Sequence, residues 1–308
     1  MLDYVKYFEL TNIPIPTDDD AILHYLIEDK LVAERGGFLY DITNLGAISF
    51  ARRLTSFNGV SRKSLRVIRY EGTNKLKTIR EDIGNKGYAA GFKGLLGYID
   101  NMLLKEEISG ALRKNVSAYP KIALRELVAN AIIHQDFSIG GTGPMVEIFD
   151  NRIEITNPGK PLVDFMRIID NPPRSRNDHL ASLMRRLGIC EERGSGWDKI
   201  AISCEVKQLP APKIDTYDEH TKVTIYSHLD FGAIDEKGKL WSCYMHAYIK
   251  HTHHERMTNT SLRERFGVSK DKQPDIARLI KRTMDKGWIK PFDPNTAPRH
   301  FSYVPFWA

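Results

Sequence analysis

The chain has 308 residues, 42% of them hydrophobic, and a formal net charge of +6. This composition supports folded cores and excludes general disorder, and the length predicts two or three domains. The three cysteines, Cys190, Cys204 and Cys243, are scattered and fit neither a disulfide framework nor a zinc site. We find no signal peptide and no apolar run long enough to span a bilayer, so we expect a cytoplasmic protein with no membrane partner.

The positive charge is concentrated in the last quarter of the chain. Residues 236–308 contain 14 Lys and Arg and 7 Asp and Glu, a net charge of +7, which leaves −1 for residues 1–235. This asymmetry predicts a polyanionic partner for the C-terminal part. A merely solvated surface would show the same charge.

The N-terminal residues predict a small mixed segment. It is either a connector that packs on its neighbour or, because it combines a helix, a hairpin and basic residues, a DNA-binding wing. Acidic residues in the first turn, a Gly-Gly hairpin signal and a threonine cap define its elements. These are a helix over Asp18–Glu28, strands over Leu31–Glu34 and Phe38–Tyr40, a helix capped by Thr43 and a strand over Ser64–Tyr70.

Residues 121–137 predict a helix with one chemically distinct stripe. Pro120 suits the start of this helix, and apolar residues recur after it with helical spacing. Glu126, Asn130 and His134 fall at i, i+4 and i+8, which places a carboxylate, a carboxamide and an imidazole along one side. The stripe is either the wall of a site that can hold a hard cation or a polar face in water.

The residues around this helix predict helices on one face of a mixed sheet. No strand followed by G-x-G-x-x-G and no Walker motif is present, so neither a Rossmann site nor a P-loop is supported. The expected elements are a helix over Phe92–Leu104, a hairpin of Met145–Phe149 and Arg152–Thr156 that runs into Asn157-Pro158-Gly159, helices over Asp178–Leu187 and Trp197–Cys204 flanking a Gly-rich turn, and a strand over Val223–Tyr226.

Residues 236–308 predict a winged helix-turn-helix. A helix over Leu240–Lys250, a second capped by Thr260 or Ser261, and a third with Pro274 in its first turn precede two short strands. Such a module binds DNA through its third helix, or serves only in dimerisation. The side chains expected to read DNA are those displayed by the third helix: Lys272, Gln273, Arg278, Lys281 and Arg282.

Three motifs together resemble the GHKL ATPases, which have a Bergerat ATP-binding fold. The chain is more closely similar to bacterial ATP-binding transcriptional regulators that carry a divergent GHKL domain. Such regulators usually carry a Schlafen/AlbA-like domain ahead of the part seen here, so the resemblance implies a truncated or naturally short form. The similarity covers nearly the whole chain and rests on LRELVANAIIHQDFS, FDNRIEITNPGKP, SRNDHLASLMRRL and CEERGSGWDKI.

The resemblance implies roles for individual residues. Asn130 corresponds to the asparagine that holds Mg²⁺ against the triphosphate, and Glu126 to the carboxylate that orients or deprotonates the attacking water. The residues implied in nucleotide binding are Gly194, Ser195 and Gly196 in the second glycine box, Arg176 or Arg193 beside the phosphates, Gly159 in the turn over the base and Asn157.

Asn157 is a departure from the family pattern. It stands where GHKL proteins have an aspartate that accepts a hydrogen bond from the adenine amino group. An asparagine oxygen can accept that bond, but its NH₂ group can equally donate to a carbonyl. Adenine specificity and turnover therefore both stay open.

We expect an α+β protein with three parts. Residues 1–84 form a mixed segment, residues 85–235 a GHKL-like two-layer α/β sandwich that binds ATP and Mg²⁺, and residues 236–308 a winged helix-turn-helix that binds double-stranded DNA. The expected function is transcriptional regulation in which nucleotide biases the winged helix. The alternatives are an active Mg²⁺-dependent ATPase acting on DNA, and a nucleotide-free scaffold with a protein-binding winged helix. A homodimer is compatible with this organisation.

Overall fold

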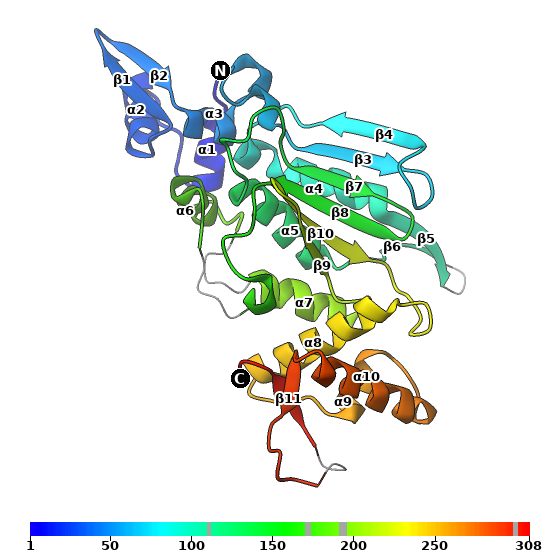
Figure 1. Ribbon diagram of the computed structural model, residues 1–308. Coiled ribbons are helices and arrows are strands. Elements are labelled where there is room, and N and C mark those ends of the chain that lie inside the picture. Colours follow the sequence, from blue (N-terminus) through cyan, green and yellow to red (C-terminus); the bar gives the residue numbers. More distant parts are fainter. Residues whose placement is uncertain (110–111, 170–173, 191–195, 298–300) are drawn as a thin grey trace. The chain divides into compact units, whose positions relative to one another are not determined.

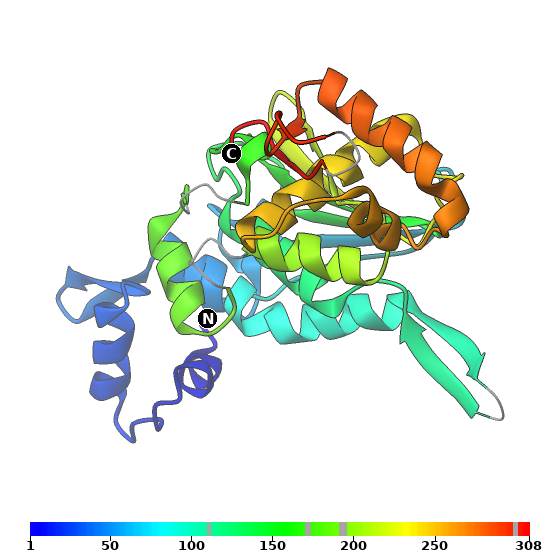
Figure 2. The same cartoon turned by 90° about the horizontal axis from the view of Figure 1, so that it is seen from below.

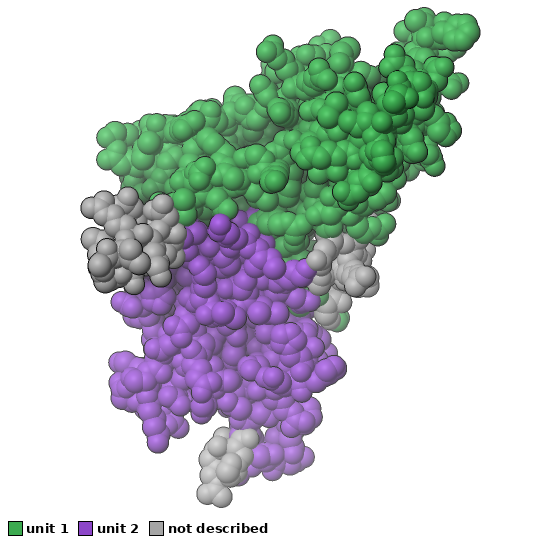
Figure 3. Space-filling view, turned by 180° about the vertical axis from the view of Figure 1, so that it is seen from behind, with its two compact units in different colours: residues 1–116, 125–196, 214–223 green, residues 117–124, 197–213, 224–308 purple. Residues whose placement is uncertain are grey.

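The computed structural model of the chain contains two compact units (Figure 3). The first unit comprises residues 1–116, 125–196 and 214–223, and the second unit residues 117–124, 197–213 and 224–308. The structure describes residues 1–109, 112–169, 174–190, 196–297 and 301–308, and for residues 105–109 and 112–116 the backbone alone.

The N-terminal part of the first unit folds as short helices around a hairpin (Figure 1). The Asp18 carboxylate accepts a hydrogen bond from the Ala21 N–H and so caps the predicted helix. The Thr43 hydroxyl caps the next helix in the same way, which confirms that prediction. The elements are α1 Tyr4–Thr11, α2 Asp19–Glu28, the antiparallel strands β1 Val32–Gly36 and β2 Leu39–Ile42, and α3 Asn44–Phe50.

A six-stranded mixed sheet follows, in the order β4-β3-β7-β8-β10-β9. Strands β3 and β7 are parallel, whereas the β3–β4 and β7–β8 pairs are antiparallel. The hairpin around Asp150-Asn151 is confirmed, but β4 and β9 were not expected from the sequence. The strand bounds are β3 Arg66–Tyr70, β4 Thr78–Ile83, β7 Met145–Ile148, β8 Arg152–Pro158, β9 Lys213–Thr216 and β10 His220–Tyr226.

Helix α4 lies on one face of this sheet, where Tyr98 of α4 hydrogen-bonds Asp82 of β4 (Figure 1). It is followed by a hairpin that the sequence did not predict and that extends away from the sheet (Figure 2). The bounds here are α4 Tyr88–Leu103, β5 Leu104–Ser109, β6 Leu112–Ser117, α5 Lys121–Ile133, α6 Asp178–Arg186 and α7 Gly196–Val206, with single 3₁₀ turns at Leu54–Ser56, Ser61–Lys63 and Phe165–Arg167.

The second unit contains three helices and a two-stranded hairpin after α7. The predicted cap of the middle helix is wrong, because that helix begins earlier. The Thr258 hydroxyl accepts from the Ser261 N–H and the Ser261 hydroxyl accepts from the Thr258 N–H, so two helix-start donors are satisfied reciprocally. The bounds are α8 Glu236–Thr252, α9 Asn259–Arg265, a 3₁₀ turn at Lys270–Lys272, α10 Gln273–Asp285, β11 Ile289–Pro291 and β12 Tyr303–Pro305.

Aromatic side chains fill the centre of the second unit. The Tyr244 ring lies edge-on to that of Tyr248, and Trp288 and Trp307 contact this pair. Among the described residues, no helix has both the length and the apolar composition needed to cross a membrane.

Candidate functional site

The polar stripe of α5 faces the interior of the protein. The Glu126 side chain is 2% exposed, and Asn130 and His134 are partly buried. The Arg125 guanidinium donates to Glu126 Oε1 at 3.1 Å. A buried carboxylate needs such a partner, because removing a charge from water is costly. The stripe is therefore not a face in water.

Gly196, the first residue of α7, lies directly beside this stripe. A methyl group placed on Gly196 would be 3.5 Å from Glu126 Oε2 and 3.9 Å from Asn130 Nδ2. The end of the predicted Gly-rich turn and the α5 stripe are thus neighbours, although about 65 residues separate them along the chain. The other predicted residues of this turn, Arg193, Gly194 and Ser195, lie outside the described residues.

The turn after β8 requires glycine. Gly159 has a φ of +105°, and a methyl group there would lie 3.0 Å from Asp136 Cβ. The Gly159 N–H donates to Glu219 O at 2.6 Å, and the Thr221 hydroxyl donates to Gly159 O at 2.6 Å. The Asn157 NH₂ group donates to Pro158 O at 3.3 Å. This orientation turns the NH₂ group toward the backbone and leaves the amide oxygen for the acceptor role.

Arg176 has protein partners on both of its terminal nitrogens. Its Nη1 pairs with Asp136 Oδ2 at 2.9 Å, and its Nη2 donates to Lys160 O at 2.8 Å. The next residue, Asn177, donates to Ile133 O and Gln135 O at 2.7 and 2.8 Å and so satisfies carbonyls at the end of α5. Arg176 and Asn177 together hold the segment before α6 against the end of α5.

Asp136 and Asn177 were missed by the sequence reasoning. Asp136 has a local signal, because its Oδ1 accepts hydrogen bonds from the Ser138 N–H at 2.9 Å and the Ser138 hydroxyl at 2.5 Å, as the spacing D-x-S allows. Asn177 has no such signal, since the carbonyls that it binds are more than 40 residues away.

The electrostatics of this region favour a neutral imidazole beside an ionised carboxylate. Burial lowers the pKa of His134, and the nearby Arg176 cation lowers it further. Hydrogen bonds from Ser138 lower the pKa of Asp136, with smaller contributions from the charges of Arg176 and Lys63. His134 is therefore uncharged at neutral pH and Asp136 is a carboxylate.

Lys63 contacts the loop that follows α5. Its Nζ donates to Ile139 O at 2.6 Å and lies 5.7 Å from the centre of the Phe137 ring. The Tyr88 hydroxyl donates to the Lys63 carbonyl, and the Gln135 side chain donates to that hydroxyl at 2.9 Å. Burial lowers the pKa of Lys63. These contacts fix the loop to residues before β3.

The donor set of the stripe fits Mg²⁺ better than a metal bound wholly by protein. Within the described ranges, no group of three or more His, Cys, Asp and Glu is placed to hold a metal ion. Glu126 and Asn130 offer a carboxylate and a carboxamide beside Gly196. Mg²⁺ is commonly held by one or two protein oxygens together with phosphate and water.

Four of the five side chains predicted to read DNA lie on the exposed side of α10, whose other side is buried through Ile276, Leu279 and Ile280. The fifth, Lys272, is exposed at the end of the 3₁₀ turn just before this helix. Asp275 pairs with two of the predicted cations, with Lys272 at 3.7 Å and with Arg278. Arg282 pairs with Glu236 at 2.9 Å. Gln273 and Lys281 are exposed, and no ion pair with Lys281 occurs among the described residues.

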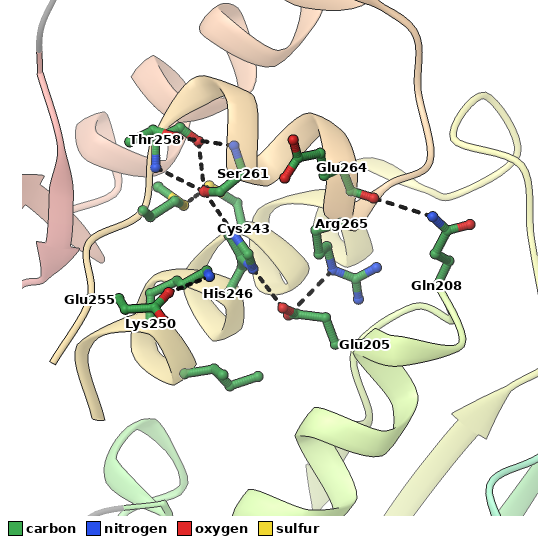
Figure 4. A network of polar contacts seen from close by, with 12 residues as sticks. Glu205, Gln208, Cys243, His246, Lys250, Glu255, Thr258, Ser261, Glu264 and Arg265 are labelled. Atoms are coloured by element: carbon green, nitrogen blue, oxygen red, sulfur yellow. Dashed lines mark hydrogen bonds and ion pairs between the residues drawn. The ribbon is translucent and has the colours of Figure 1, made fainter. Parts of the chain in front are cut away.

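A second polar cluster lies inside the second unit (Figure 4). Glu205 Oε1 is 2.8 Å from His246 Nδ1, and His246 Nε2 is 3.0 Å from the Ser261 hydroxyl. Glu205 Oε2 is 3.9 Å from Arg265 Nε, and Arg265 Nη2 donates to Leu209 O at 2.7 Å. The series resembles a hydrolase triad in outline, but the Ser261 hydroxyl accepts from the Thr258 N–H in the capping box of α9, and His246 is buried. We interpret the cluster as structural.

Comparisons with known proteins identify part of the chain. Residues 141–225 match the family described as "Putative ATP-dependent DNA helicase recG C-terminal", which identifies this segment as an ATPase-like domain of the GHKL type. A search among curated proteins found no match. The fold is similar to the crystal structure of the DIP2311 protein from Corynebacterium diphtheriae, with a TM-score of 0.58 and 14% identity over 98% of this chain. The chain spans 60% of that protein.

Proposed function

We propose that the protein binds ATP with Mg²⁺ and regulates transcription through a C-terminal module that binds double-stranded DNA. The observation that carries the nucleotide part is the approach of Gly196 to Glu126 and Asn130. A glycine at a helix start beside a carboxylate and a carboxamide suits a triphosphate, because backbone N–H groups there can point at phosphate oxygens. The ATPase-like match over residues 141–225 supports nucleotide binding in general and includes Gly196, whereas Glu126 and Asn130 lie before the matched segment.

Individual residues have distinct proposed roles. Asn130 holds Mg²⁺ against the phosphates, and the bound Mg²⁺ would neutralise phosphate charge. The side-chain oxygen of Asn157 accepts a hydrogen bond from the adenine amino group, and Gly159 allows the turn that follows Asn157. Arg176 contributes to phosphate binding by giving up its ion pair with Asp136 and pairing with a phosphate oxygen of the nucleotide instead. Arg193, Gly194, Ser195 and Gly196 are the residues proposed to bind the phosphates.

The DNA part of the proposal rests on charge and on element order. Helices α8, α9 and α10 followed by the β11–β12 hairpin are the elements of a winged helix. This part of the chain holds the net charge of +7. Nucleotide would bias its orientation or dimerisation through a coupling free energy of about 1–3 kcal/mol, typical of linked sites.

Isothermal titration of ATP and Mg²⁺ into wild type and Asn130→Ala tests the nucleotide claim. We expect binding by wild type and loss of Mg²⁺-dependent affinity in Asn130→Ala. Asn101→Ala, on an exposed position of α4, is the matched control and should bind as wild type does. Absence of binding by wild type would remove the claim.

The burial of Glu126 beside Gly196 favours a second candidate function, ATP hydrolysis. A buried carboxylate can serve as a base or orient water. In that case Glu126→Gln abolishes phosphate release and retains nucleotide binding. If the wild-type protein releases no phosphate, with or without DNA, the hydrolysis candidate fails and regulation by nucleotide binding alone remains.

Gel shifts over a salt series test the DNA claim. Lys281→Ala should weaken DNA binding. It should also reduce the slope of log affinity against log salt concentration by roughly one, because one phosphate contact is lost. Arg278→Ala should do less, because Asp275 already neutralises Arg278 in the free protein. Failure of wild type to bind DNA would favour the scaffold with a protein-binding winged helix.

A further inference from the structure

A groove follows helix α4 within the first unit. Its volume is about 780 Å³, which lies within the range of about 300–1,000 Å³ that is typical of small-molecule sites. The residues that line it come from the start of α1, from β3 and the residue before it, from the end of β4 and the turn after it, from α4 and from α5. The groove is therefore built by several segments of one unit.

The base of the groove is apolar. Leu65, Val67 and Ile132 line it and are 3%, 2% and 1% exposed. Leu65 and Val67 are two residues apart and so lie on the same face of the sheet. An apolar part of a ligand would gain free energy by leaving water for this base.

The side of α4 that borders the groove carries mostly small residues. A methyl group on Gly94 would meet no atom within 4 Å, so the groove stays open at this position. From Gly87 to Tyr98 the chain rises by about 16 Å, and dividing the volume by this length gives a mean cross-section of about 50 Å². A long, narrow groove suits an extended chain better than a compact molecule. The residues from this segment that line the groove recur with helical spacing: Gly87, Ala90, Gly91, Gly94, Leu95 and Tyr98.

The acidic residues of the groove already have partners. Asp3 accepts a hydrogen bond from the Lys6 N–H at 3.2 Å. Asp82 pairs with Arg80 at 2.7 Å and accepts a hydrogen bond from the Tyr98 hydroxyl. Neither carboxylate is therefore left to attract a cation into the groove.

Two lysines at the rim of the groove differ from these acids. Lys86 and Lys93 line the groove and are exposed, and among the residues that the structure describes neither forms an ion pair. A methyl group on Gly91 would lie 3.3 Å from Lys86 Cβ, so the start of the Lys86 side chain lies close to α4. Positive charge beside an apolar base is complementary to an apolar molecule that carries an anionic group.

We propose that this groove binds an elongated apolar molecule with one carboxylate, of the fatty-acid type. The apolar chain lies against Leu65, Val67 and Ile132, and the carboxylate pairs with Lys86 and Lys93 at the exposed rim. The site is distinct from the candidate nucleotide site. Ile132 and Asn130 are two residues apart on α5 and so point about 160° away from each other around that helix.

Isothermal titration of decanoate into the full chain tests the groove. Wild type should bind one decanoate per chain. Gly94→Leu should raise the Kd at least tenfold, because the new side chain fills the groove, and it should not unfold α4, because leucine favours a helix more than glycine does. Gly97→Leu is the matched control, since this glycine of α4 also meets no atom within 4 Å but lies outside the groove. Absence of binding by wild type, or equal binding by wild type and Gly94→Leu, would overturn the proposal.

A comparison of decanoate with decan-1-ol tests the role of the lysines. The double variant Lys86→Gln with Lys93→Gln should raise the Kd of decanoate about threefold to tenfold and leave that of decan-1-ol unchanged, because only the carboxylate pairs with lysine. Lys77→Gln, at an exposed lysine outside the groove, should change neither. Equal effects of the double variant on both ligands would refute the carboxylate. Wild type that is dimeric without decanoate and monomeric as Gly94→Leu would assign the groove to a second copy and also overturn the proposal.

Discussion

Each unit contains a glutamate that is mostly buried and paired with an arginine, but the surroundings of the two carboxylates differ. Both carboxylate oxygens of Glu205 have fixed partners within the second unit, His246 at 2.8 Å and Arg265 at 3.9 Å. Glu126 meets Arg125 through Oε1, and its Oε2 lies toward the glycine at the start of α7. The two side chains that meet Glu205 are an imidazole and a guanidinium, whereas Glu126 borders a residue that has no side chain.

This difference separates a structural carboxylate from a candidate functional one. A charge that is enclosed by hydrogen-bonding side chains stabilises the arrangement of the helices that supply them. A charge beside a glycine leaves room for a ligand at no steric cost to the fold. Substitutions should therefore affect stability at Glu205 and binding at the α5 stripe.

The largest expected effect on stability is that of Glu205→Gln. The Arg265 side chain is 2% exposed and would lose its carboxylate, and burial already lowers the pKa of this guanidinium. We expect a loss of about 2–4 kcal/mol, the usual consequence of breaking a buried ion pair. Urea unfolding followed by tryptophan fluorescence measures it. Glu255→Gln, at an exposed residue paired with Lys250, should change nothing measurable, and an equal loss there would contradict the argument.

Gly196→Ala should affect binding and not folding. The added methyl group would lie at an ordinary contact distance of 3.5 Å from Glu126, so the fold should accept it. It would occupy space that a triphosphate needs, and we expect a loss of about 1–2 kcal/mol of binding free energy, or roughly 5–30-fold in Kd. Titration with an ATP analogue measures this. Gly97→Ala on α4, where a methyl group meets no atom, should bind nucleotide normally.

The stability of the protein should depend on pH through His134. Its pKa is lower in the folded chain than the ordinary value near 6.5, so the unfolded chain takes up a proton first. The neutral His134 imidazole contributes fully to the free energy of unfolding above about pH 6.5, and this contribution is lost as the pH falls toward the pKa of His134 in the folded chain. His134→Gln should reduce the slope of unfolding free energy against pH by up to about 1.4 kcal/mol per pH unit. Identical slopes for both proteins would refute this.

The smallest expected effect is that of Asp136→Asn. Asp136 and Arg176 are each about one quarter exposed, so their pair should contribute only about 0.5–1 kcal/mol. The pKa of Asp136 is lowered, so this contribution is present above about pH 4 and is lost as the pH falls through the folded pKa. Denaturation of both proteins at pH 7 and pH 3 should show a difference at pH 7 that is smaller at pH 3.

Local signals in the sequence predicted most of the elements. Asp18 and Thr43 cap helices as expected, Asp150-Asn151 turns a hairpin, and Pro274 lies in the first turn of α10. The edge strand β4 was missed because Thr-Ile-Arg-Glu-Asp-Ile has charged residues where alternation was sought, and an edge strand tolerates charge on both faces. The predicted cap of α9, Thr260 or Ser261, was misplaced by two or three residues, because Thr258 near the same helix start also carries a hydroxyl.

The residue types of the candidate site were determined by the sequence alone. The spacing of Glu126, Asn130 and His134 defines one side of a helix wherever that helix packs. Only the tertiary structure decided that this side is buried and that Gly196 lies against it. It also showed that Arg176 pairs with Asp136, which is 40 residues away along the chain. Helical periodicity is a local property of the backbone, whereas the partner of a charge depends on contacts between distant segments, which no local pattern specifies.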